Sequence, residues 1–228
     1  MSVRNIFVSE ERILCLTDTM IYSGGKPLGL VTAKCGLTIN EQVAFASRGA
    51  AWFGIVAATA MADCACFDDF TDGLEALASA VKADPACLQA SVGELTYMGW
   101  SDAQQRLCAV VVQFPQDGGG AYEAKELPPG LHLAPGVPGA KLPATVTDDI
   151  MVKVALAQQK VATHFKLPAC IGGIMHLTTV TKEGAARRMV GAYPDFEEHA
   201  RTLPNSASNV EEYRAFCDDQ AFMSEVLP

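Results

Sequence analysis

The first 36 residues, MSVRNIFVSEERILCLTDTMIYSGGKPLGLVTAKCG, decide the fold class. Residues 4–8 are a short segment rich in strand-forming residues, and residues 12–17 alternate or run apolar. Three polar residues, 9–11, separate them, which predicts two strands joined by a turn. Ser23-Gly24-Gly25 marks another turn. We expect two further strands, at 28–34 and 42–47, so that the chain opens with a run of antiparallel strands.

The rest of the chain contains helical and strand patterns without an internal repeat or a domain linker. We expect helices at 50–63, 71–82, 147–165 and 210–218, and strands at 92–98, 106–114, 121–125, 174–181 and 186–193. Thr147 and Asn209 are expected to cap the last two helices, and Phe216 and Phe222 to dock the final one. Residues 127–143 are rich in proline and glycine and predict an irregular connection. Helices segregated from antiparallel strands predict one α+β domain over residues 1–228, with two packed sheets flanked by helical layers.

The composition excludes several classes of protein. Of the 228 residues, 50% are hydrophobic, and the formal net charge is −9. This acidity argues against nucleic-acid binding. No apolar run reaches the length of about 18 residues that a membrane helix needs, and the N-terminus lacks the pattern of a secretory signal, so we expect a cytoplasmic protein. The eight cysteines are interpreted as core residues rather than disulfides or a zinc site, and we expect no cofactor or metal.

Three residues near the N-terminus form a candidate catalytic group. If Met1 is removed, Ser2 carries both a hydroxyl nucleophile and a free amine that can act as its base. Lys34 would favour the alkoxide, and Asp18 would hold Lys34 in place. A plain ion pair between Asp18 and Lys34 on adjacent strands, or two solvated side chains, would give the same sequence pattern.

The order of elements and the position of these residues resemble the proteasome β-subunit family of N-terminal-nucleophile hydrolases. The pattern is most similar to the bacterial ATP-dependent protease peptidase subunit. Ser2, Asp18 and Lys34 match the family's nucleophile, aspartate and lysine without a gap. Its turn glycine matches Gly24, and its late Gly-Gly pair matches Gly172-Gly173. Gly49 matches the glycine whose backbone N–H faces the oxyanion, although an ordinary glycine before a helix would look the same.

The resemblance implies a four-layer αββα sandwich of two antiparallel sheets. It also implies a homo-oligomer that can assemble as a ring and that cleaves peptides or small amides. An ATP-driven partner would feed substrate into such a ring. Two departures favour an alternative, a catalytically inactive structural or assembly subunit. The nucleophile is serine where the family usually has threonine, and residues 168–173 lack the Asp and Ser that support the N-terminal amine. A small-molecule binding protein with residues 127–143 as a lid is a third interpretation.

Overall fold

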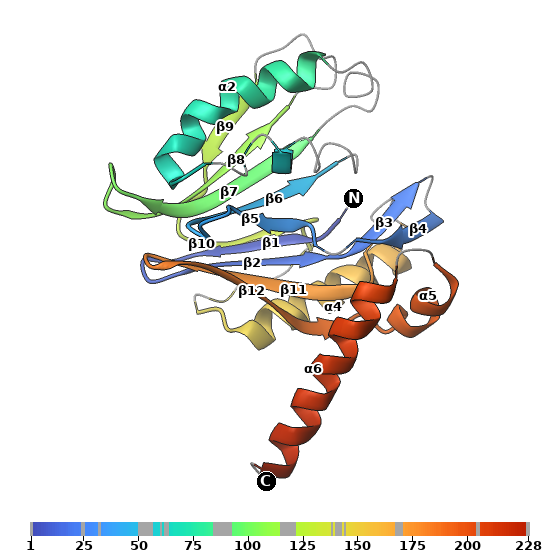
Figure 1. Cartoon of the computed structure of the whole chain (residues 1–228). Coiled ribbons are helices and arrows are strands. Elements are labelled where there is room, and N and C mark those ends of the chain that lie inside the picture. Colours follow the sequence, from blue (N-terminus) through green and yellow to red (C-terminus); the bar gives the residue numbers. More distant parts are fainter. Residues whose placement is uncertain are drawn as a thin grey trace.

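The computed structural model is a mixed α+β fold dominated by antiparallel sheets (Figure 1). It describes residues 2–23, 26–31, 33–49, 57–59, 61, 64–83, 93–114, 122–137, 139, 143, 145–166, 171–203 and 206–226. Gly24, most of the helix expected at 50–63 and residues 168–170 lie outside this described part. No helix within the described part is long and apolar enough to cross a membrane.

The first sheet has five strands in the order β10-β1-β2-β11-β12, and every neighbouring pair is antiparallel. The strands are β1 (Arg4–Val8), β2 (Ile13–Asp18), β10 (Gly130–Ala134), β11 (Ile174–Thr181) and β12 (Gly184–Ala192). All residues of β1 and β2 are buried. Burial on both faces explains why these strands do not alternate regularly between apolar and polar residues.

The second sheet has the order β5-β6-β7-β8-β9 and is also antiparallel throughout. Its strands are β5 (Cys35–Leu37), β6 (Val43–Arg48), β7 (Glu94–Ser101), β8 (Arg106–Gln113) and β9 (Glu123–Glu126). A separate hairpin of β3 (Met20–Ser23) and β4 (Lys26–Leu30) follows directly from β2.

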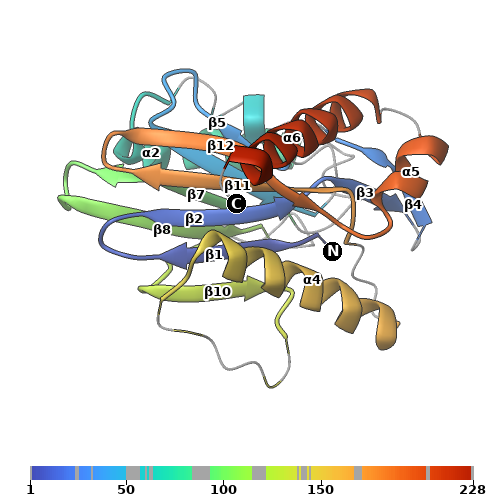
Figure 2. The same ribbon diagram turned by 90° about the horizontal axis from the view of Figure 1, so that it is seen from below.

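The two sheets face each other, and helices cover their outer faces (Figures 1 and 2). One apolar cluster joins β1 and β2 to β6, β7 and β8 between the sheets. A second packs α2 (Phe67–Ala83) against the second sheet. A third packs α4 (Asp148–His164) against the first sheet. The small α5 (Phe196–Thr202) and the long α6 (Ala207–Val226) share a fourth cluster with β3, β4, β11 and β12.

The expected elements are confirmed in type for most of the chain, with several corrections. β3 and β5 were not expected as strands. The strand expected at 28–34 ends at Leu30, and Lys34 lies in the link before β5. The stretch 127–143 is not wholly irregular, because residues 130–134 form β10 and pair with β1. α5 was not expected at all, because its seven residues carry too few apolar positions to show a helical period.

A further correction concerns one of the two expected helix caps. Thr147 caps α4 as expected, since its side chain accepts a hydrogen bond from Ile150 N. Asn209 does not cap the last helix: α6 begins earlier, at Ala207, and Asn209 lies inside it. α6 is also longer than the helix expected at 210–218. Phe216 packs in the fourth cluster as expected, whereas the side chain of Phe222 lies outside the described residues.

Candidate active site

The ammonium group of Lys34 connects the three predicted catalytic residues. Lys34 Nζ lies 2.9 Å from Ser2 Oγ and 2.8 Å from Asp18 Oδ2. It also donates a hydrogen bond of 2.5 Å to the carbonyl oxygen of Met20. The side chain of Lys34 is only 12% exposed and that of Asp18 is 0% exposed. The ion pair is therefore buried, and it is in direct contact with the Ser2 hydroxyl.

Asp18 is held by backbone donors as well as by the lysine. Val3 N donates to Asp18 Oδ1 at 3.0 Å, and Gly172 N lies 3.5 Å from Asp18 Oδ2. Burial raises the pKa of the Asp18 carboxyl, whereas Lys34 and these two N–H groups oppose the rise. The carboxylate thus has a donor on each oxygen, as a buried charge requires.

Strand pairing explains why residues distant in sequence meet here. In the β1–β2 ladder Arg4 pairs with Thr17, so the chain that precedes Arg4 runs alongside Asp18. Asp18 also pairs with Met175 of β11. The link that carries Lys34 is fixed at its carbonyl, which accepts a hydrogen bond of 3.3 Å from Ser47 N at the end of β6.

Gly49 follows β6 directly and adopts a φ of +124°, a conformation that glycine accepts and other residues resist. It is exposed. The backbone bond between Ser47 and Lys34 places the end of β6 beside the lysine link. The helix expected after Gly49 begins outside the described residues, so its start is not compared with the prediction.

The Gly172-Gly173 pair precedes β11 as expected, and it does more than open a strand. Gly172 O accepts hydrogen bonds from Thr19 N and Met20 N, at 3.3 and 3.1 Å. Gly173 has a φ of +86°, and a Cβ atom there would lie 2.3 Å from Thr19 Oγ1. The pair therefore lies directly against the chain that follows Asp18, and only glycine fits at its second position.

A buried charged cluster that sequence reasoning missed lies between the two sheets. Glu94 of β7 pairs with Arg4 of β1 and, at 3.6 Å, with Arg48 of β6. The three side chains are 16%, 8% and 14% exposed. Arg4 is two residues after Ser2, and Arg48 immediately precedes Gly49, so this cluster joins the strand that follows Ser2 to the strand that precedes Gly49. Isolated charges inside apolar strands were the only signal for it in the sequence.

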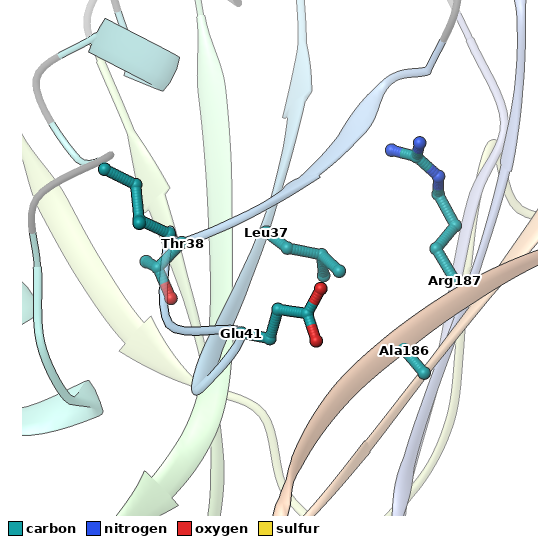
Figure 3. A pocket seen from close by; sticks show the side chains of 6 residues that line it. Leu37, Thr38, Glu41, Ala186 and Arg187 are labelled. Carbon is teal, nitrogen blue, oxygen red and sulfur yellow. The ribbon is translucent and has the colours of Figure 1, made fainter.

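A pocket of about 530 Å³ lies next to this region but does not contain the candidate residues (Figure 3). It is lined by Leu37, Thr38, Ile39, Glu41, Ala186 and Arg187. Arg187 Nη1 donates a hydrogen bond of 2.8 Å to the carbonyl of Cys35, the residue after Lys34.

Among the described residues, no group of three or more His, Cys, Asp or Glu side chains could hold a metal ion.

The chemistry available to this site is activation of a hydroxyl. An ammonium at hydrogen-bond distance from Ser2 Oγ stabilises developing negative charge on that oxygen, and a buried carboxylate fixes the ammonium. No protein-family model matches the chain, and a search of curated proteins finds no match either. We therefore infer the function from the geometry of the site and the spacing of its residues.

Proposed function

We propose that this protein is an N-terminal-nucleophile hydrolase of the proteasome type that cleaves amide bonds through Ser2. The contact of Lys34 Nζ with both Ser2 Oγ (2.9 Å) and the buried Asp18 carboxylate (2.8 Å) carries the proposal. A surface ion pair or two solvated side chains would leave Asp18 and Lys34 exposed to water, whereas both are buried. Neither alternative accounts for the contact between the ammonium and the Ser2 hydroxyl.

The arrangement of layers supports the same proposal. α2 packs against the second sheet, α4 packs against the first, and an apolar cluster fills the space between the sheets. We assign these layers to the αββα sandwich of the N-terminal-nucleophile hydrolases. In that arrangement the start of β1, which follows Ser2, and the end of β6, which precedes Gly49, come from the two different sheets.

In the proposed mechanism, removal of the residue before Ser2 frees its amine. Ser2 Oγ attacks the substrate carbonyl, and its proton passes to that amine. Lys34 keeps the amine neutral and stabilises the attacking oxygen, while Asp18 fixes Lys34. Gly49 N–H stabilises the oxyanion. The amine then gives the proton to the leaving nitrogen as the C–N bond breaks, and water hydrolyses the acyl ester on Ser2.

The resemblance extends the proposal to assembly and location. We propose a cytoplasmic homo-oligomer, with a ring as the form that would confine the site, acting on peptides or small amides. Sedimentation velocity of the native protein at micromolar concentration tests the assembly: a mass of two or more times the 24.2 kDa chain supports it, and a monomer contradicts it.

The function is tested by intact-mass analysis before and after incubation with a β-lactone, which acylates activated serine and threonine hydroxyls. We expect a chain that begins at Ser2 and gains the mass of one lactone. Ser2→Ala should abolish the adduct, Ser2→Thr should retain it, and Lys34→Met should slow it about 100-fold or more, as for loss of a preorganised charge. The matched control is Ser208→Ala, which removes an exposed serine on α6.

A folded chain that keeps its amine blocked and takes up no lactone would refute the hydrolase. That outcome would favour the alternative, a catalytically inactive subunit of the same fold in which the Asp18–Lys34 pair only stabilises the structure. An adduct that persists in Ser2→Ala would show that another residue is the nucleophile.

A further inference from the structure

Asp18, Thr19 and Met20, at the junction of β2 and β3, determine where the ammonium group of Lys34 lies. Asp18 ends β2 and Met20 begins β3, and both accept hydrogen bonds from Lys34 Nζ. Only Thr19 lies between them. A change in the backbone at Thr19 therefore moves the carboxylate and the carbonyl relative to each other, and with them the ammonium that contacts Ser2.

Thr19 is 0% exposed, and all its polar atoms are hydrogen bonded. Its N–H donates to Gly172 O, and its carbonyl accepts from Val31 N at 2.9 Å. Its hydroxyl accepts from Ile174 N at 3.0 Å and donates to Asn209 Oδ1 at 2.8 Å. The hydroxyl thus joins the start of β11 to a residue of α6.

Asn209 comes from the last helix of the described chain and is also 0% exposed. Its Oδ1 receives the Thr19 hydroxyl, and its Nδ2 donates to Val31 O at 3.1 Å. Val31 in turn donates its N–H to Thr19 O. One amide side chain therefore holds both ends of the β3–β4 hairpin. A buried asparagine with both functional atoms used in this way is costly to replace.

The docking of α6 places Asn209 in this position. Val210, Tyr213 and Phe216 pack in the same cluster as Met20. Glu212, one turn after Asn209 on the same helix, accepts a hydrogen bond of 2.9 Å from His176 Nε2 of β11. Beyond this contact α6 extends away from the sheets (Figure 1), and residues 217–220 are exposed. The first turns of α6 are thus the part that reaches the site.

We propose that Asn209 is a positioning residue for the Ser2–Lys34–Asp18 site, acting through the Thr19 hydroxyl. This inference rests on the proposed function for its effect on catalysis. Asn209 touches neither Ser2 nor Lys34; it fixes the backbone that presents both acceptors of the lysine. The C-terminal helix is accordingly part of the catalytic framework, although it is about 190 residues away in sequence from Thr19.

Two measurements on Asn209→Ala test the inference. The first is the rate of Ser2 acylation by the β-lactone, which we expect to fall about 10- to 100-fold, as for a misplacement of about 1 Å in an active site. The second is the titration of Lys34 followed by NMR in protein with ¹³C-labelled lysine, which does not depend on activity. Weaker acceptors favour the charged lysine less, so its midpoint should move to lower pH.

Variants of Thr19 distinguish positioning from a general loss of stability. Thr19→Ser keeps the hydroxyl and should behave nearly as the wild type, whereas Thr19→Val should match Asn209→Ala. The double variant Thr19→Val/Asn209→Ala should be no slower than the slower single variant, because both remove the same contact. Ser208→Ala, next to Asn209 but exposed, should change neither measurement. If Asn209→Ala does not fold, Thr19→Val carries the test, because it removes the same hydrogen bond from the Thr19 side.

The outcomes separate this inference from the proposed function. If wild-type Ser2 is not acylated but the Lys34 titration moves in Asn209→Ala, the hydrolase proposal fails and the positioning role stands. If Asn209→Ala is folded and leaves both the acylation rate and the Lys34 titration unchanged, the positioning role is wrong. Additive effects of the two variants would also refute action through Thr19.

Discussion

Replacing Asp18 by asparagine tests the buried ion pair on which the site depends. Asparagine has the size of aspartate but no charge, so it would leave the ammonium of Lys34 buried without its partner. Lys34 is 12% exposed and Asp18 0% exposed, with 2.8 Å between Nζ and Oδ2. Coulomb's law with an effective dielectric constant of about 20 gives an attraction of about 6 kcal/mol at this separation.

This attraction is of the same order as the cost of removing both charges from water, which is several kcal/mol for each ion. The intact pair therefore adds little to the net free energy of unfolding, but removal of one partner leaves an uncompensated buried charge. We expect Asp18→Asn and Lys34→Met each to lower the free energy of unfolding by about 3–5 kcal/mol. The double variant should lose less than either single variant.

Urea unfolding of the wild type, the two single variants and the double variant measures the coupling energy between Asp18 and Lys34. Unchanged m-values would show that the four transitions can be compared. The matched control is Glu126→Gln, which neutralises one partner of the exposed Arg106–Glu126 pair, whose side chains are 49% and 37% exposed. It should cost no more than about 1 kcal/mol. Losses from Asp18→Asn and Lys34→Met that add within about 0.5 kcal/mol would show that the two groups do not interact, and would refute the reasoning behind the site.

Two further predictions concern buried ionisable groups around the site. Glu94→Gln should lower the free energy of unfolding by about 3–5 kcal/mol, because it leaves Arg4 and Arg48 without a counter-ion between the sheets; a loss in urea unfolding as small as that of Glu126→Gln would contradict this. Burial lowers the pKa of His176, although Glu212 opposes the shift. The unfolded chain then binds the proton more readily, so stability should fall as the pH drops below about 6.5. His176→Gln should lack that component of the thermal unfolding profile, and an unchanged profile would refute it.

The sequence was sufficient to bring Ser2, Asp18 and Lys34 into one candidate site. The two strands at 4–8 and 12–17 are joined by a short turn, so their pairing follows almost directly from local patterning. The apolar neighbours of Asp18 also indicated a buried charge that needs a partner. The structure places Lys34 against both other residues. Its position in a link rather than in a strand was missed, because residues 30–33, Leu-Val-Thr-Ala, contain no turn residue that would mark the end of β4.

Other parts of the framework depend on contacts between distant segments. β10 was hidden by flanking prolines and glycines, and it is a strand because it adds an edge to β1. Asn209 has the local features of a helix cap, yet it bonds Thr19 because apolar packing docks α6 on the β3–β4 hairpin. The Arg4–Glu94–Arg48 cluster exists only when the two sheets stack.

The chain's amino-acid pattern alone thus determined the α+β class, the antiparallel start and the identity of the central polar residues. These follow from interactions between neighbours in sequence, which periodicity and turn residues report. How the sheets are joined and where the last helix docks were decided by tertiary structure. The contacts that join Arg4 to Glu94 and Thr19 to Asn209 link residues about 90 and 190 positions apart, and no local preference specifies them.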